Sequence, residues 1–145
     1  MQPTRILVVE DYEPFSRLIS QTLQQDQTFD VVAAVSDGLT AVHTAEDLQP
    51  DLILLDIRLP KQNGIEAARQ IRRLAPQSKI LFVSQESSPT IIWHALDLGA
   101  WGYILKSDAP TELLPAVNSV LHGTKYVSAG CRKALASSAL NGSEG

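Results

Sequence analysis

The chain has 145 residues, a length typical of one compact domain with a sizeable core. An apolar fraction of 44% and a charged fraction of 19% exclude a mainly disordered protein. The net charge of −4 argues against DNA binding by this chain alone, because neutralising phosphates requires a clustered basic surface. One cysteine, Cys131, excludes a disulfide scaffold and fits a reducing cytoplasm. No apolar stretch near the N-terminus has the length of a signal peptide or a membrane span, so we expect a cytoplasmic chain without membrane contact.

Short runs rich in β-branched residues recur at a steady interval and predict strands. Most of these runs are unbroken rather than alternating, which is typical of a parallel sheet whose two faces are both covered. Stretches with helical spacing separate the runs, and Asp37 and Asn63 are placed to cap two of these helices. We therefore expect an α/β fold of five βα units with helices on both faces of the sheet. The predicted strands are residues 6–9, 31–35, 52–55, 80–83 and 103–105.

The pattern weakens after residue 123, so we expect a domain over 1–123 and a C-terminal extension or linker over 124–145. Residues 126–128 are expected to form a short extended piece. Residues 132–140 have helix propensity but almost no apolar face. The composition of residues 141–145 indicates a flexible end.

Polar side chains follow four of the predicted strands, at the point where each strand ends. Glu10 and Asp11 come after the first run, and Asp56 comes directly after the third. Ser84 ends the fourth run, and Lys106 ends the fifth. Because binding sites in open parallel sheets form at the carboxyl ends of strands, we expect these side chains to converge on one edge.

The expected cluster has the chemistry of a phosphoryl site. Three neighbouring carboxylates repel one another, and a divalent cation would remove that repulsion. Oxygen ligands with room for water favour Mg²⁺, and the three histidines are far apart in sequence and offer no competing site. Lys106 and Ser84 could bind an anionic group, and Asp56 is suited to act as a carboxylate nucleophile that forms an acyl phosphate.

Two segments carry a resemblance to a known family. Residues 56–64 read D-I-R-L-P-K-Q-N-G, and residues 99–106 read G-A-W-G-Y-I-L-K. Together with the acids at positions 10 and 11 and with Ser84, they resemble the receiver domain of bacterial two-component response regulators over about residues 4–123. Residues 106–123 are similar to receivers that carry a LuxR/FixJ-type (NarL-like) helix-turn-helix domain.

The resemblance implies a flavodoxin-like (CheY-like), doubly wound sheet of five parallel strands in the order 2-1-3-4-5. It implies that Asp56 accepts a phosphoryl group from a sensor histidine kinase. It also implies a Mg²⁺ ion held by Glu10, Asp11, Asp56 and the backbone carbonyl of Arg58. Such a domain is a phospho-acceptor switch with weak self-catalysed phosphorylation and dephosphorylation rather than an enzyme.

The resemblance assigns roles to three further residues. Lys106 would pair with the phosphoryl group, and Ser84 would move to form a hydrogen bond with it. Tyr103 would then swing inward, which would couple the site to a protein–protein surface.

One departure from the family pattern lies beside the serine. The family usually has a small residue at position 85, whereas this chain has Gln85, followed by Glu86. Arg58 and Glu86 each lie two residues beyond a site residue and are expected to face each other across the entrance. We hypothesise that these residues modulate the site by shielding the acyl phosphate and slowing its hydrolysis.

The expected output is control of transcription through an output domain that is absent from this chain, with DNA bound only by that domain. The partners considered are a sensor histidine kinase and a second copy of the chain in a homodimer. One alternative is a stand-alone or degenerate receiver that acts by docking only. A flavodoxin-like redox carrier would need a loop rich in Ser, Thr or Gly after the first strand, where this chain has residues 10–13, E-D-Y-E. A small aspartyl phosphatase would need its nucleophilic acid after the first strand and a second acid two residues beyond it, whereas the acid directly after the first run, Glu10, has Tyr12 at that spacing.

Overall fold

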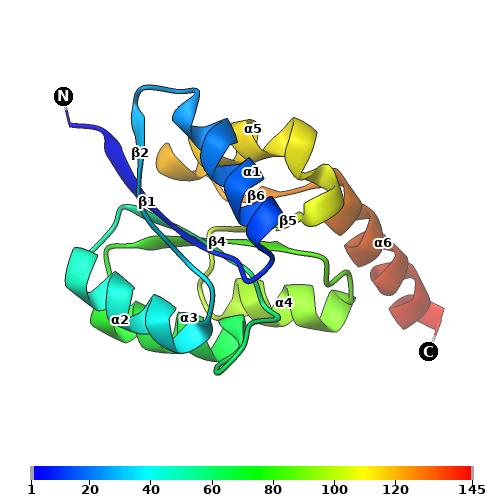
Figure 1. Cartoon of the computed structure of the whole chain (residues 1–145). Coiled ribbons are helices and arrows are strands. Elements are labelled where there is room, and N and C mark those ends of the chain that lie inside the picture. The colour runs from blue at the N-terminus through cyan, green and yellow to red at the C-terminus, as the bar shows by residue number, and fades with distance from the viewer. Residues whose placement is uncertain (1, 145) are drawn as a thin grey trace. The chain divides into compact units, whose positions relative to one another are not determined.

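The computed structural model describes residues 2–144, with side chains through residue 138. All strands pair in parallel, and the sheet order is β2-β1-β3-β4-β5-β6 (Figure 1). The flavodoxin-like order 2-1-3-4-5 is confirmed, and a sixth strand extends it. The elements are β1 (Thr4–Val9), α1 (Glu13–Gln24), β2 (Phe29–Val35), α2 (Gly38–Leu48), β3 (Leu52–Leu55), α3 (Gly64–Leu74), β4 (Lys79–Ser84), α4 (Pro89–Asp97), β5 (Gly102–Leu105), the 3₁₀ turn η1 (Lys106–Asp108), α5 (Ala109–Leu121), β6 (Tyr126–Val127) and α6 (Ala129–Glu144).

The chain forms two compact units, and the first is Met1–Ile80. In this unit α1 lies on one face of the strands, while α2 and α3 lie side by side on the other face (Figure 1). Residues 6–9 and 52–55 are each at most 2% exposed. Because both faces of β1 and β3 are covered, these strands have unbroken apolar runs rather than an alternating pattern.

Both predicted helix caps of this unit are confirmed. The Asp37 carboxylate accepts a hydrogen bond from the backbone N–H of Thr40 at 2.8 Å, and α2 begins at the next residue. The side chain of Asn63 accepts one from the backbone N–H of Glu66 at 3.0 Å, at the start of α3. Each cap satisfies a backbone donor that has no partner within its own helix. The cap at Asn63 fixes where the segment after Asp56 ends.

The second unit is Leu81–Gly145, and it extends the expected fold by one strand and one helix. Tyr126 and Val127 form β6, which pairs in parallel with Gly102 and Tyr103 of β5. The helix α6 then runs from Ala129 to Glu144, so the expected flexible end is helical through residue 144. Residue 145 lies outside the described residues.

Two carboxylates from upstream elements cap α6. The Asp108 carboxylate accepts hydrogen bonds from the Ser128 hydroxyl at 2.7 Å and from the backbone N–H of Gly130 at 2.9 Å. Glu112 accepts one from the N–H of Ala129 at 3.1 Å and one from the Tyr126 hydroxyl at 2.6 Å. The bond to Glu112 raises the pKa of Tyr126 to about 12. Carboxylates at a helix N-terminus satisfy free N–H groups and complement the helix dipole, so residues 126–130 are anchored to η1 and α5.

None of the helices within residues 2–144 combines the length and the apolar character that crossing a membrane requires.

Candidate functional site

Strand register in the first unit brings two acidic residues together at one edge. Val9 of β1 is in register with Leu55 of β3, so the residues that follow, Glu10 and Asp56, leave neighbouring strands at the same level. The N–H of Asp56 donates to the carbonyl of Val9 at 3.1 Å. On the other side, the N–H of Glu10 donates to the carbonyl of Val35 at 3.0 Å. The peptides of both acids are therefore fixed by the ends of the strands.

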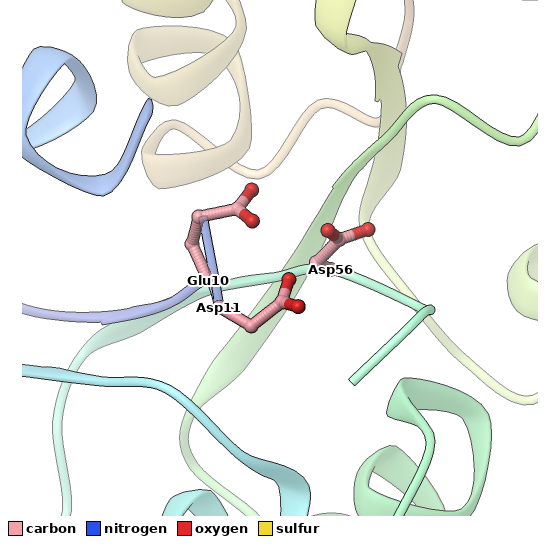
Figure 2. A group of neighbouring side chains, drawn as sticks. All are labelled: Glu10, Asp11 and Asp56. Atoms are coloured by element: carbon pink, nitrogen blue, oxygen red, sulfur yellow. The ribbon is translucent and has the colours of Figure 1, made fainter. Parts of the chain in front are cut away.

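Glu10, Asp11 and Asp56 form an acidic cluster (Figure 2). Each offers a carboxylate oxygen, and these three oxygens lie within 4.8 Å of one another. Glu10 and Asp56 are each only 3% exposed, whereas Asp11 is exposed. The carboxylate of Asp56 accepts a hydrogen bond from the N–H of Ile57 at 2.7 Å, and that of Glu10 accepts one from the N–H of Tyr12 at 3.0 Å. The cluster thus has two buried members and one that solvent reaches.

The donor set of the acidic cluster fits a hard divalent cation. All three donors are carboxylate oxygens, the ligands that Mg²⁺ and Ca²⁺ prefer over softer donors. Negative charge held in close quarters next to buried strand ends favours binding of a cation. The exposed position of Asp11 leaves one side of the cluster open to water and to ligands. The residues present can therefore hold a divalent metal ion.

A tight loop over residues 57–63 follows Asp56. The N–H of Gly64 donates to the carbonyl of Ile57 at 2.7 Å and closes this loop. A Cβ atom at Gly64 would lie 1.9 Å from the carbonyl oxygen of Asp56, so only glycine permits this approach. Arg58, whose carbonyl the resemblance makes a metal ligand, lies in the loop and its side chain is exposed.

Ser84 and Tyr103 belong to the second unit and meet the same short segment after β4. Ser84 is fully buried, and its hydroxyl accepts a hydrogen bond from the N–H of Glu86 at 3.1 Å. The Tyr103 hydroxyl donates to the carbonyl of Glu86 at 2.7 Å. Tyr103 is also fully buried, and its ring lies 6.0 Å from that of Phe82. In this structure Tyr103 therefore points inward and is hydrogen-bonded to the segment that follows Ser84.

Lys106 follows β5 at the level where Ser84 ends β4. Ser84 is in register with Leu105, and Lys106, partly exposed, begins η1. Gln85 is exposed and Glu86 is half-buried. In the second unit Ser84 and Tyr103 thus both bond to Glu86, and Lys106 follows the neighbouring strand.

Sequence reasoning treated Asp37 only as a helix cap and did not single out Gly38 or Lys61. The structure places Asp37 and Gly38 against the loop that follows Asp56, and Lys61 is the residue of that loop that faces Asp37. The Asp-Gly pair at the start of α2 was the available signal, because glycine is required wherever two backbones approach closely.

Comparison with known proteins identifies the family. Residues 6–118 match the response regulator receiver domain. The transcriptional regulatory protein DegU of Brevibacillus brevis is 36% identical over 123 residues, which are 85% of this chain and 52% of DegU. The nitrate/nitrite response regulator NarL of Escherichia coli K12 is 31% identical over 137 residues, which are 94% of this chain and 63% of NarL. The chain therefore spans between about half and two thirds of these curated relatives.

A solved structure agrees with the sequence relatives. A LuxR-family two-component response regulator from Aurantimonas sp. superposes with a TM-score of 0.89 at 27% identity, covering 96% of this chain and 99% of that one. Receiver domains of this family are phospho-acceptor switches rather than conventional enzymes. The match over residues 6–118 and these relatives together show that the chain belongs to the receiver domain family of two-component response regulators and resembles its LuxR/FixJ-type (NarL-like) members.

Proposed function

We propose that this chain is a phosphorylation switch in which Asp56 accepts a phosphoryl group with the help of Mg²⁺. The observation that carries the proposal is the acidic cluster at the ends of β1 and β3. We assign the nucleophilic role to Asp56 because it begins the D-I-R-L-P-K-Q-N-G segment that carries the family resemblance, and its carboxylate is oriented by the N–H of Ile57. Glu10, Asp11 and the carbonyl of Arg58 complete the proposed metal ligands.

In the proposed reaction a phosphoryl group moves to an oxygen atom of Asp56 from a nitrogen or oxygen atom of the donor. A carboxylate oxygen of Asp56 forms a bond to phosphorus while the bond from phosphorus to the donor breaks. The leaving group keeps the electron pair of the broken bond: the imidazole nitrogen of the kinase histidine then takes up a proton from solvent, whereas the carboxylate of a small acyl phosphate donor leaves as the anion. Bound Mg²⁺ would offset the charge of the carboxylates and of the incoming phosphoryl oxygens.

Two residues of the second unit are proposed to bind the phosphoryl group. The Lys106 ammonium would pair with a phosphoryl oxygen, and the Ser84 hydroxyl would donate a hydrogen bond to another. Tyr103, through its bond to the carbonyl of Glu86, would change the segment that follows Ser84. Such a change at a local contact is the usual start of a switch that alters a binding surface.

Intact mass spectrometry after incubation with a small phosphodonor tests the proposal. We expect a gain of one phosphoryl group that requires Mg²⁺ and is lost in Asp56→Asn. A matched control is Asp47→Asn, which removes an exposed carboxylate on α2. A folded wild-type chain that gains no mass in the presence of Mg²⁺ would favour a receiver that acts by docking only.

We further propose that Arg58, Gln85 and Glu86 lengthen the life of the aspartyl phosphate by limiting access of water. Lowering the barrier to hydrolysis by about 1 kcal/mol raises the rate about fivefold. We therefore expect Arg58→Ala and Glu86→Ala to speed dephosphorylation about fivefold, followed by mass spectrometry after removal of the donor. Arg73→Ala, on an exposed position of α3, should leave the rate unchanged. Unchanged rates in the two site variants would contradict this role.

The proposed partners are a sensor histidine kinase and, after phosphorylation, a second copy of the chain. The relatives include a transcriptional regulatory protein and a nitrate/nitrite response regulator of greater length. We propose that this receiver controls transcription in the cytoplasm through an output domain that binds DNA. Autodephosphorylation at the same site would reset the switch.

A further inference from the structure

The N-terminus of α2 contacts the loop that follows Asp56. The N–H of Gly38 donates to the carbonyl of Pro60 at 3.2 Å. A Cβ atom at Gly38 would lie 1.9 Å from the carbonyl oxygen of Gln62 and 2.7 Å from its carbonyl carbon. Real Cβ atoms do not approach a backbone this closely, so the contact between α2 and the loop requires glycine at position 38.

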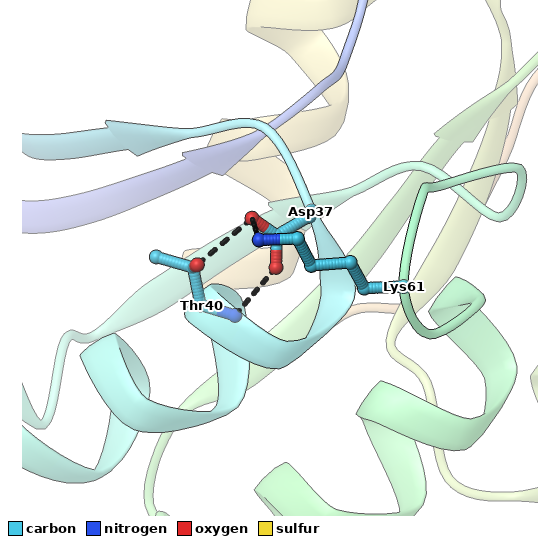
Figure 3. Close-up of polar contacts among 3 residues, drawn as sticks. All are labelled: Asp37, Thr40 and Lys61. Atoms are coloured by element: carbon cyan, nitrogen blue, oxygen red, sulfur yellow. Dashed lines mark hydrogen bonds and ion pairs between the residues drawn. The ribbon is translucent and has the colours of Figure 1, made fainter.

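An ion pair lies beside this backbone contact. The Asp37 carboxylate accepts hydrogen bonds from the backbone N–H and the hydroxyl of Thr40, both at 2.8 Å (Figure 3). These bonds, that from the backbone N–H first, hold the pKa of Asp37 below its ordinary value, so the carboxylate is charged at neutral pH. The same carboxylate lies 4.0 Å from the Lys61 ammonium, which reaches it from the loop (Figure 3). We call Asp37, Gly38, Pro60, Lys61 and Gln62 the α2 bracket.

The loop adopts an unfavourable backbone conformation at the point where the α2 bracket holds it. Lys61 has a φ of 69°, in the left-handed region that residues with a side chain rarely adopt. The N–H of Gln62 donates to the carbonyl of Pro60 at 2.7 Å across this turn. Such a conformation persists where the surrounding contacts enforce it, and it is often found at functional sites.

The other end of the loop is tied to the acidic cluster. Ile57 directly follows Asp56, and the bond between Ile57 and Gly64 closes the loop at its base. The Arg58 peptide therefore lies between two fixed points, the Asp56 backbone and the α2 bracket. Because the loop is short, a displacement of Pro60 or Gln62 moves the Arg58 peptide as well.

We propose that the α2 bracket sets the affinity of the acidic cluster for Mg²⁺ by fixing the position of the Arg58 carbonyl, which makes Asp37 and Gly38 positioning residues. This rests on the proposed function, in which that carbonyl is a metal ligand. Mg²⁺ demands nearly ideal octahedral geometry, whereas Ca²⁺ accepts varied geometries and ligand numbers. A displaced carbonyl therefore weakens binding of Mg²⁺ more than binding of Ca²⁺.

The test is a calorimetric titration of the full chain with MgCl₂ and, separately, with CaCl₂. We expect Gly38→Ala to raise the Kd for Mg²⁺ at least about 10-fold, the size of effect seen when contacts that orient a metal ligand are lost. The Kd for Ca²⁺ should rise by a clearly smaller factor. Asp37→Asn keeps one oxygen acceptor for the N–H of Thr40, replaces the other with an NH₂ group that can donate to the Thr40 hydroxyl, and loses the charge that faces Lys61, so we expect a rise of about two- to fivefold for Mg²⁺.

A matched control separates positioning from general destabilisation. Glu46 is exposed in the last turn of α2, and Glu46→Gly lowers helix stability without touching the α2 bracket. This variant should bind Mg²⁺ as the wild type does. A change in its Kd comparable with that of Gly38→Ala would show that Mg²⁺ binding follows the stability of α2 rather than the bracket.

The remaining outcomes separate this inference from the proposed function. If Asp37→Asn binds Mg²⁺ with the Kd of the wild type, the role of the α2 bracket is overturned. This result is decisive even if Gly38→Ala does not fold. Equal weakening of Mg²⁺ and Ca²⁺ binding also overturns it, because displacement of one carbonyl predicts a difference. Failure of the wild-type chain to bind Mg²⁺ would instead refute the proposed function, and the inference with it.

Discussion

Replacing Asp11 by asparagine is expected to raise the Kd for Mg²⁺ by a factor of about 10 to 100, or more. Loss of a contact that merely orients a metal ligand costs this much, and Asp11 would lose a ligand charge itself. Of the acidic cluster, Asp11 is the exposed member, so its substitution disturbs the packing of β1 and β3 least. The measurement is a calorimetric titration with MgCl₂.

The free energy of unfolding provides a second measurement for Asp11→Asn. A ligand that binds only the folded state stabilises it by about 2.7 kcal/mol at 100 times its Kd. Wild-type chain should therefore gain stability as Mg²⁺ is added, and Asp11→Asn should gain much less. Without Mg²⁺ the variant should be at least as stable as the wild type, because one of three mutually repelling charges is gone. The control is Asp47→Asn, which should gain as much stability from Mg²⁺ as the wild type. An equal gain in Asp11→Asn would contradict the assignment of Asp11 as a metal ligand.

Replacing Gly64 by alanine is expected to lower the free energy of unfolding by about 3 kcal/mol, the upper part of the range for overpacking. A Cβ atom there would lie 1.9 Å from the carbonyl oxygen of Asp56 and 2.8 Å from the Cα atom of Ile57. Both neighbours are backbone atoms next to a buried strand end, so a change of side-chain rotamer cannot relieve the clash with the added Cβ atom. Either α3 must move or Asp56 must shift, and the second change would also slow phosphoryl uptake.

Urea unfolding measures the loss in Gly64→Ala, and a second glycine supplies the control. Gly123 has a φ of 85° and no atom within 4 Å of an added Cβ. Gly123→Asn should cost less than about 1 kcal/mol, because asparagine tolerates the left-handed region. A loss of similar size in Gly64→Ala would mean that α3 moves away freely and that the close approach to Asp56 is not required.

The sheet could be predicted from the sequence because burial of both strand faces leaves a direct pattern. Residues 6–9 and 52–55 are unbroken apolar runs, and each is a central strand of the structure. Parallel strands place their carboxyl ends at one edge, and the structure brings Glu10, Asp11 and Asp56 together there. The caps at Asp37 and Asn63 could be predicted because a capping residue bonds N–H groups only three positions away.

The docking of α6 could not be predicted, because the contacts that anchor it are distant in sequence. Residues 132–140 have almost no apolar face, so the hydrophobic pattern carried little signal. The caps of α6 come from Asp108 and Glu112, about 20 positions before the N–H groups that they bind. The α2 bracket escaped prediction for the same reason, since Gly38 and Gln62 meet only in the folded chain. How Ser84 and Lys106 act on a phosphoryl group at Asp56 stays a prediction.

Chemical trapping of the modified residue tests the central claim most directly. Borohydride reduces an acyl phosphate to an alcohol, so a phosphorylated aspartate is converted to homoserine. After treatment with a small phosphodonor and Mg²⁺, peptide mass mapping should place homoserine at position 56 and at no other aspartate. Homoserine at another aspartate, or phosphate retained on a serine or histidine after reduction, would contradict the assignment of Asp56 as the phosphoryl acceptor.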